Sequence, residues 1–431
     1  MKTLVTSLLA LLFCNGAPRA QGDVLVVASA GGAPYTSIQA AVDAAALGDV
    51  VLVKAGTYDG FRVIEGVAIV ADEAAGVVVN GTIIVNGISQ EQSLLVHRLQ
   101  ANSIGGPTDD YGPALTVKFS AGSVRAQSCL LQGSADRPGA RFTSSGAAAL
   151  VDSLARTNST GFDLEGAGVH FAGGNLALYG CEARGGAGPV GPSNTQPPAC
   201  YGKKGGPGLL ANAFGFVFAG TTMFQGGQGG AGGSGCSVGP VGCCGGGDGG
   251  NGVALLDSTQ TWWRYDDLLL GGGGGLGGVG SCGCDLSTSC TCDAGSTGAT
   301  IVSTPGDALS AVAGQVSTLS VAANPLRELA TTTIRVQAQV GDVVHLAVAR
   351  TPAFVPEVGR GVRLVGADGH FGFRDLGPTD ASGRVELVWT VPALVPGVES
   401  SIVHVQALVK RVDGKRLWSN PVQIVVLDQA F

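Results

Sequence analysis

Short apolar segments separated by turn residues recur through most of this chain, and this repetition restricts the folds available to it. A unit of three to five apolar residues cannot bury its apolar face alone, so neighbouring units have to stack. Irregular spacing suits stacked coils with variable loops better than a propeller or a sandwich. The early segments, bounded by Gly, Asn and Ser, are residues 67–70, 77–79, 82–85, 94–96 and 114–117.

Four later units share a longer pattern that ends in a glycine. Apolar residues precede each unit, and the final residues keep the same offset to the glycine. We therefore expect these units to occupy equivalent positions in successive coils. They are VRAQSCLLQG at 124–133, LALYGCEARG at 176–185, TMFQG at 222–226 and DLLLG at 267–271.

The alignment makes a prediction about two cysteines. Cys129 and Cys181 occupy equivalent positions, but a further coil around residues 150–154 lies between them. Stacked strands are about 4.8 Å apart, so the two cysteines should be roughly 9.6 Å apart, beyond the reach of a disulfide. We expect that they do not bond to each other.

The first 20 residues are typical of a secretory signal peptide. Lys2 precedes an apolar stretch at residues 4–13, and a small-residue segment ends at Ala20. The apolar stretch is too short to span a bilayer, and no later run approaches a membrane span. We expect a secreted or cell-surface protein with no transmembrane segment in the mature chain. Removing Cys14 leaves ten cysteines, an even number in an oxidising compartment.

Residues 35–58 contain a short helix pattern followed directly by a strand pattern. Thr36 and Gln39 form a capping-box pattern, Gly48 is expected to stop the helix, and residues 49–58 read DVVLVKAGTY. This run resembles the opening of right-handed parallel β-helix proteins of the pectate-lyase-like superfamily. The resemblance implies an all-β fold in which the helix caps a right-handed parallel β-helix over residues 21–305.

The same resemblance does not bring an activity with it. The superfamily includes pectate lyases, pectin methylesterases, polygalacturonases and alginate epimerases, and none of their catalytic motifs is present in this sequence. The Arg-Pro-Trp, Gly-His-Gly and Asp-Pro-His-Asp segments are all missing. The resemblance therefore implies a fold and not a reaction.

Three glycine- and cysteine-rich loops leave the repeats just after the aligned strands, at residues 185–208, 226–252 and 271–298. Glycine makes up 72 of 431 residues, against a usual share of about 7 %. Such loops lose much entropy on ordering, and disulfides are the favoured remedy. Zinc or iron–sulfur ligation and a reactive vicinal pair are alternatives. The disulfide candidates are Cys200, Cys236, Cys243, Cys244, Cys282, Cys284, Cys290 and Cys292.

Two other interpretations of these loops stay open. Gly-Gly-x runs such as residues 226–233 can stack as polyproline-II-like strands. Residues 246–254 nearly match a calcium-binding nonapeptide, with Asn251 in place of aspartate. Such calcium sites need adjacent repeats, and this chain has one degenerate copy. We favour a flexible loop and keep structural calcium as an alternative; no other cofactor is expected.

Beyond a composition change near residues 322–325, β patterns continue without cysteine. We expect a linker at 306–330 and a small β-sandwich of immunoglobulin-like type at 331–431, because six or seven short strands alternate with turns there.

The richest polar–aromatic cluster occupies residues 261–267. On a strand, Trp262, Arg264 and Asp266 would share one face, and Trp263 and Tyr265 the other. Exposed rings could stack on sugars, whereas buried rings would serve packing, which we favour. The candidate ligand-binding residues are Trp262, Trp263, Arg264, Tyr265, Asp266 and Asp267.

Charge and motif content together restrict the function. The net charge is −7 and only 13 % of residues are charged, which argues against a nucleic-acid partner that is held by a strong positive field. We expect a non-catalytic exported protein that binds a carbohydrate or matrix polymer along the β-helix. A divergent polysaccharide lyase or glycoside hydrolase is the alternative, and a structural spacer is a third.

Overall fold

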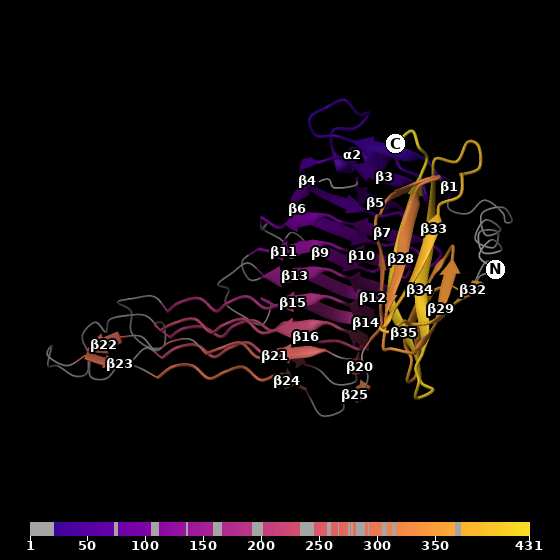
Figure 1. The fold of residues 1–431 in the computed structure, drawn as a ribbon. Helices are drawn as coiled ribbons and strands as arrows, with labels where there is room; N and C mark the ends of the chain where they lie inside the picture. Colours follow the sequence, from indigo (N-terminus) through magenta and orange to yellow (C-terminus); the bar gives the residue numbers. More distant parts are fainter. Residues whose placement is uncertain are drawn as a thin grey trace.

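The computed structural model describes residues 21–431 except 73–75, 105–111, 135–136, 158–165, 192–200, 233–244, 257–259, 266, 275, 277–278, 282–288, 292, 304–307, 313–315 and 367–371. In these residues the regular secondary structure is almost entirely β-strand, with one helix (Figure 1). A 22-stranded sheet winds through the first three quarters of the chain, and all of its strand pairs are parallel. This arrangement is consistent with a parallel β-helix.

The strands of this sheet stack in three ladders. The first ladder contains β2 (Val24–Val27), β3 (Val50–Val53), β5 (Ala68–Ala71), β7 (Ser93–His97), β10 (Ser123–Gln127), the later parts of β12 (Ala140–Val151) and β14 (Val169–Tyr179), β17 (Gly215–Gly220), β20 (Gln260–Tyr265) and β25 (Ala308–Val312).

The second ladder contains β4 (Gly56–Val63), β6 (Val77–Asn86), β8 (Gln100–Asn102), β11 (Leu130–Gly133), β13 (Leu154–Thr157), β15 (Glu182–Arg184), β18 (Met223–Gln225) and β21 (Leu268–Leu270). The third contains the later parts of β4 and β6, β9 (Leu115–Lys118), the first parts of β12 and β14, β16 (Leu209–Ala211), β19 (Val253–Leu255) and β24 (Ile301–Val302).

Alternation along each strand separates the core from the outer faces. On β10, Val124 and Ala126 belong to the continuous apolar core inside the three ladders, whereas Arg125 and Gln127 point outward. The predicted cysteine geometry is confirmed. Ser153 lies on the coil between Cys129 and Cys181, and both thiols are free.

The helix α2 (Ile38–Ala44) lies at the N-terminal end of the stack (Figure 1). A short helix is found in the segment where the sequence predicts one, but its caps differ from the prediction. The Ser37 hydroxyl accepts a hydrogen bond from the Ala40 amide, so Ser37 and not Thr36 is the N-cap. The helix ends before Ala45, ahead of Gly48. Ile38 and Ala41 are buried in the core of the stack.

The C-terminal region forms two main sheets with a shared core, and their strand pairs are antiparallel except for β27 with β35. One sheet contains β26 (Thr318–Val321), β28 (Thr331–Gln337) and β33 (Arg384–Thr390). The other contains β27 (Leu326–Arg327), β35 (Arg416–Leu427), β34 (Ser400–Lys410), β29 (Val343–Ala349) and β32 (Gly372–Pro378), and β1 (Gln21–Gly22) pairs with β34. A hairpin of β30 (Pro352–Glu357) and β31 (Gly361–Val365) completes the region.

The described residues of the segment expected as a linker, 306–330, include the strands β25, β26 and β27. Its strand β25 belongs to the first ladder, and its strands β26 and β27 belong to the two C-terminal sheets. The physical reason is strand pairing, because the backbone amides and carbonyls of each of these short strands form hydrogen bonds with a longer neighbouring strand. Residues 21–22, expected within the β-helix, pair instead with the C-terminal β34.

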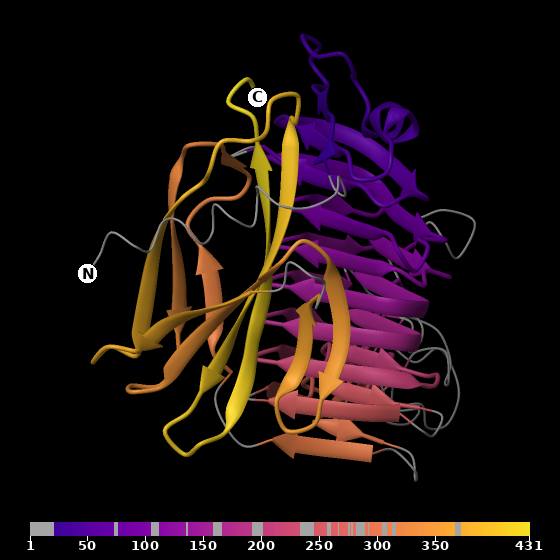
Figure 2. The ribbon, with the colours of Figure 1, turned by 90° about the vertical axis from the view of Figure 1, so that its right-hand side faces the viewer.

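The C-terminal region lies against the first ladder along much of its length (Figure 2). Near the N-terminal end, Val50 and Leu52 pack with Ile402 and Val425. Further along the stack, Tyr179 and Phe218 pack with β31 and β35. The two parts therefore share apolar clusters and do not behave as separate modules joined by a free linker. In the described part of the chain, no helix is long and apolar enough to cross a membrane.

Candidate binding surfaces

The aromatic cluster predicted from the sequence lies on β20 and serves packing. Trp262 is 1 % exposed in the core of the stack and meets Phe224 edge to face, with ring centroids 6.2 Å apart. Tyr265 is 1 % exposed on the outer side and lies beside Phe218. Neither ring can stack on a sugar, so an exposed platform is not what the structure shows for these two residues.

The neighbours of these rings are also engaged. Trp263 meets Phe216 edge to face with ring centroids 4.8 Å apart, in the cluster shared with the C-terminal region. The Asp267 carboxylate accepts a hydrogen bond from the Thr222 amide at 3.0 Å. Arg264 is half-buried, and Asp266 lies outside the described residues. The predicted division of faces holds for Trp262 and Trp263, which point to opposite sides.

Eight cysteines of the glycine-rich loops are predicted to form disulfides. Cys200, Cys236, Cys243, Cys244, Cys282, Cys284 and Cys292 lie outside the described residues. The backbone of Cys290 lies on β23 (Ser289–Thr291), which pairs with β22 (Val279–Ser281) at the far end of the glycine-rich segments (Figure 1). The disulfide prediction and its metal-binding alternative both stay predictions.

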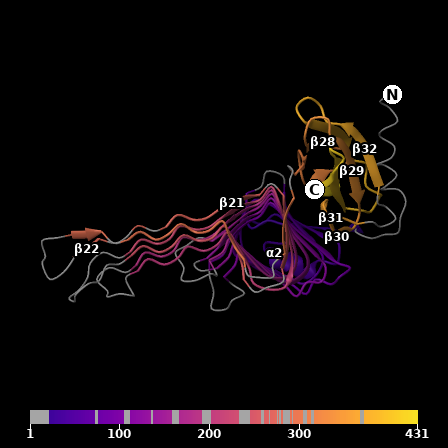
Figure 3. The ribbon, with the colours of Figure 1, turned by 90° about the horizontal axis from the view of Figure 1, so that it is seen from below.

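The described glycine-rich segments run side by side away from the stack, as Figures 1 and 3 show. We call this set the glycine array and define it as residues 185–191, 201–208, 226–232, 245–252, 271–274 and 293–299. Three segments continue second-ladder strands outward, namely those that follow β15, β18 and β21. The loops thus project together from one side, as their shared starting point predicts.

Hydrogen bonds in the array recur every third residue. Gly226, Gly229 and Gly232 donate to the carbonyls of Leu270, Gly273 and Leu276 on one neighbouring segment. Gly227 and Gly230 donate to a different neighbour, at Gly206 and Lys203. A period of three matches a polyproline-II helix, whose backbone makes no internal hydrogen bonds and can bond sideways, whereas a β-strand repeats every two residues. The polyproline-II alternative is therefore the arrangement observed.

Close approach of the backbones explains the glycine content. A Cβ atom added to Gly227 would overlap the carbonyl of Gly186, and one added to Gly250 would overlap the carbonyl of Gly206. A Cβ added to Gly273, by contrast, would meet nothing within 4 Å. Two positions in each triplet are therefore restricted to glycine wherever another segment lies against them, and a larger residue fits there only at an open site. The third position projects outward.

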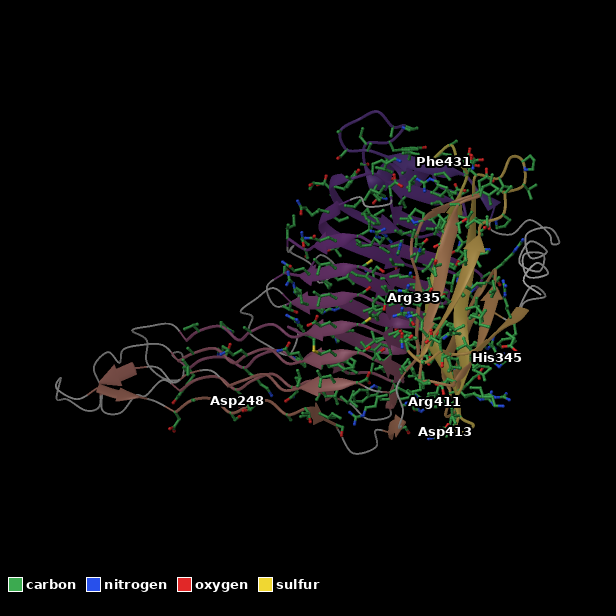
Figure 4. The ribbon with its side chains drawn as sticks, viewed as in Figure 1. Asp248, Arg335, His345, Arg411, Asp413 and Phe431 are labelled. Atoms are coloured by element: carbon green, nitrogen blue, oxygen red, sulfur yellow. The ribbon has the colours of Figure 1, made fainter. Side chains whose placement is uncertain are left out.

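Outward positions of the array carry the side chains, including those of the calcium-like motif. Asp248 lies on the array (Figure 4), and its carboxylate accepts hydrogen bonds from the amide and hydroxyl of Ser296 at 2.8 and 2.7 Å. These bonds hold the pKa of Asp248 below its ordinary value. The Asn251 side-chain oxygen accepts from the Ala299 amide. Both oxygens thus tie adjacent segments together. Among the described residues no cluster of three or more His, Cys, Asp or Glu could hold a metal.

The outer face of the second ladder is the most regular exposed surface of the stack. We call it the outer ladder face and define it by the outward side chains of β8, β11, β13, β15, β18 and β21. One line contains Gln100, Leu130, Leu154, Glu182, Met223 and Leu268 on successive strands and is mainly apolar after β8; the other is mainly polar and contains Asn102, Gln132, Arg156, Arg184, Gln225 and Leu270.

Polar contacts hold the side chains of this face in place. The Arg156 Nε donates to the Gln132 side-chain oxygen at 3.0 Å on the preceding coil. Arg184 forms an ion pair with Glu182 two residues before it. All four side chains are half-buried or exposed, so their remaining donors face outward. The face therefore presents cationic and amide donors beside an apolar strip.

Sequence reasoning missed this face, although a signal for it was present. In the aligned units, the residue before the terminal glycine is Gln132, Arg184, Gln225 or Leu270, and the structure places all four in register. The alignment itself is thereby confirmed. A long polar residue at a repeated position of a stacked coil indicates a continuous line of such side chains on one surface.

Comparison with known proteins adds no family to this picture. No protein-family model and no curated protein matches the chain. The large parallel sheet thus supports the coarse part of the resemblance, and the pectate-lyase-like assignment stays a prediction.

Proposed function

We propose that this chain is an exported, non-catalytic surface or extracellular protein that binds a carbohydrate or matrix polymer along the outer ladder face. The observation that carries the proposal is the pairing of an apolar line with a polar line, repeated on successive coils. Stacked strands repeat about every 4.8 Å, so the face presents the same chemistry at regular intervals to a chain lying along it.

A polysaccharide is the partner whose chemistry this face suits. Sugar rings have apolar C–H faces and polar edges, which match Leu154 and Met223 on one line and Arg156 and Gln225 on the other. Arginine presents several donors in a fixed geometry that suits hydroxyl and carboxylate oxygens. No cofactor enters this proposal, and structural calcium in the array remains a prediction.

The proposed export of the protein rests on the sequence, and it supports a polysaccharide as the partner. The signal-like residues 1–20 lie outside the described part, as do most of the cysteines. We propose a secreted or cell-surface location from these patterns, with no nucleic-acid partner.

The finer features of the fold are proposed on the same footing. We infer a right-handed parallel β-helix of the pectate-lyase-like type, with α2 as the cap of its open end. The support is that Ile38 and Ala41 cover core side chains that an open end would expose to water. The two C-terminal sheets around one core support an immunoglobulin-like sandwich.

Retention on immobilised polysaccharides tests the function. The full-length mature protein is passed over a panel of neutral and acidic polysaccharides. A double variant, Arg156→Gln with Arg184→Gln, should lose retention at least tenfold while its melting curve stays unchanged, because both side chains are at the surface. The matched control is Arg335→Gln on β28, an exposed arginine paired with Glu386 (Figure 4).

Two results would contradict the proposal. Equal retention of the double variant and the wild type would remove the outer ladder face as the binding surface, and failure of the wild type to bind any member of the panel would favour a structural spacer. Release of unsaturated or reducing sugar ends would favour the alternative, a divergent polysaccharide lyase or glycoside hydrolase.

A further inference from the structure

Arg125 is a buried cation between the first ladder and the C-terminal region. It lies on the outer side of β10 and is 2 % exposed. Its Nη2 donates a long hydrogen bond of 3.4 Å to the Leu364 carbonyl on β31. Its Nε and Nη1 are buried, and neither has a hydrogen-bond partner among the described residues. Two strong donors are therefore buried without an acceptor among the described residues.

His404 faces the same place from the opposite side. It lies on β34 between Val403 and Val405, which point into the C-terminal core, so its own side chain points toward the first ladder. It is 2 % exposed, and its Nδ1 is also buried without a hydrogen-bond partner in the described part of the chain. Burial, and then the charge of Arg125, lower the pKa of His404 well below its ordinary value. Gln406, two residues further on the same face of β34, accepts a hydrogen bond from the Leu364 amide, and the Leu364 carbonyl accepts one from Arg125. The face of β34 that carries His404 and the Arg125 side chain therefore meet at this residue of β31.

The polar groups around these two side chains are already engaged. The Tyr179 hydroxyl donates to the Val362 carbonyl at 3.0 Å. The Gln406 side chain donates to Val362 and Ser419 and accepts from the Leu364 amide. The charged or titratable groups coupled to Arg125 are Tyr179 and His404, and neither is a carboxylate. The protein therefore does not supply the missing acceptor among its described residues.

Arg125 nevertheless keeps its charge at neutral pH. Burial lowers its pKa to about 10, which still leaves the guanidinium protonated at pH 7. A buried charge without a counter-charge is strongly unfavourable, and buried charges in proteins are paired. Since neutral His404 can carry its proton on Nδ1, three donors are available to one negative partner.

We propose that Arg125 and His404 bind a larger, more weakly hydrated halide ion, chloride or bromide, between β10 and β34. The ion accepts from Nε and Nη1 of Arg125 and from Nδ1 of His404, and neutralises the guanidinium. The apolar clusters at both ends of the interface close the site, which suits a single-atom ion better than an organic acid. The ion would join the C-terminal region to the stack, independently of any polymer on the outer ladder face.

Bromide and chloride are the probes for this site. Crystals of the full mature protein grown in sodium bromide should show an anomalous peak within hydrogen-bond distance of Arg125 Nε and Nη1. In solution, replacing sodium fluoride by sodium chloride at constant ionic strength should raise Tm saturably, by about 2 °C once chloride exceeds its Kd about fivefold. Arg125→Met should abolish the chloride effect.

A matched control separates this effect from general salt effects. Arg327→Met removes another arginine at the same interface, one that already pairs with Asp72, and it should keep the full chloride effect. The proposal is overturned if the density beside Arg125 is water without an anomalous signal, or if Tm responds equally to fluoride and chloride. Should Arg125→Met fail to fold, the wild-type bromide and chloride measurements decide the question alone.

Discussion

The stack and the glycine array form the hydrogen bonds of their backbone amides and carbonyls in two different ways. In the stack, strands repeat every two residues and large apolar side chains such as Trp262 fill the interior. In the array, the hydrogen bonds repeat every three residues, and Gly227 and Gly250 leave no room between backbones for a side chain. Stability in the first comes mainly from apolar burial, and in the second from hydrogen bonds and close packing of glycine. The two regions should therefore respond to different substitutions.

The largest expected effect comes from emptying the core of the stack. Trp262→Ala removes the largest fully buried side chain and should lower the free energy of unfolding by about 3–5 kcal/mol. Leu276→Ala on the array, where the side chain is 73 % exposed, should change it by less than about 0.5 kcal/mol. Denaturant titration checks both values. Similar losses for the two variants would show that the array also depends on an apolar core.

Acid should weaken the body of the protein before it weakens the array. His97 is buried, and burial lowers its pKa from 6.5 to about 4. Because the pKa of His97 is lower in the folded than in the unfolded protein, the contribution of His97 to the free energy of unfolding is complete above pH 6.5. This contribution is lost as the pH falls toward 4, by about 3 kcal/mol in total.

In the array, the titratable group to compare with His97 is Asp248, whose pKa is held low by its hydrogen bonds to Ser296. Its contribution is complete above the ordinary carboxylate pKa of about 4 and is lost only below it. Unfolding free energy measured against pH, with His97→Gln as the comparison variant, should show a loss between pH 6.5 and 4 that is smaller in the variant by the contribution of His97, while the contribution of buried His404 remains in both proteins. An identical loss in both proteins would assign the acid sensitivity elsewhere.

Glycine substitution is expected to act in the array according to position in the triplet. Gly227→Ala introduces an overlap with the Gly186 carbonyl and should cost about 1–3 kcal/mol of local stability. Gly273→Ala places its methyl group in open space and should be tolerated. Limited proteolysis of the array measures the difference. Equal cleavage of both variants would contradict the close packing described here.

The smallest effect concerns the side-chain ties across the array. Asp248→Ala removes two hydrogen bonds to Ser296 and should destabilise the segment 293–299 by about 0.5–1.5 kcal/mol. Asp248→Asn keeps an acceptor oxygen and should lose less. Hydrogen exchange of residues 296–299 reports the change. A larger loss on adding a calcium chelator than on either substitution would instead support a metal at this position.

Local pattern was enough to predict the stack and its register. The constant offset of Gln132, Arg184 and Gln225 from their glycines depends on neighbours in sequence, and the structure places these residues in register. That Cys129 and Cys181 do not bond to each other followed from the same alignment.

Contacts between residues far apart in the sequence could not be predicted from local patterns in the same way. The alternation of residues around His404 distinguishes the two faces of its strand, β34. Nothing in the sequence, however, shows that Arg125, 279 residues away, lies opposite His404. The same holds for two strands of the segment expected as a linker, β25 and β27, which pair with partners about 50 and 100 residues distant. The outer ladder face needed the register of several coils before its polar line could be recognised.

Residue-resolved amide hydrogen exchange tests the central claim most directly. In the segment 226–232, Gly226, Gly227, Gly229 and Gly230 donate to neighbouring segments, whereas the amides of Gln228 and Ala231 have no partner in the described structure. Two slow amides followed by one fast amide, repeated along the segment, is the pattern that a polyproline-II array predicts. Protection at alternate residues, or uniformly fast exchange, would contradict it.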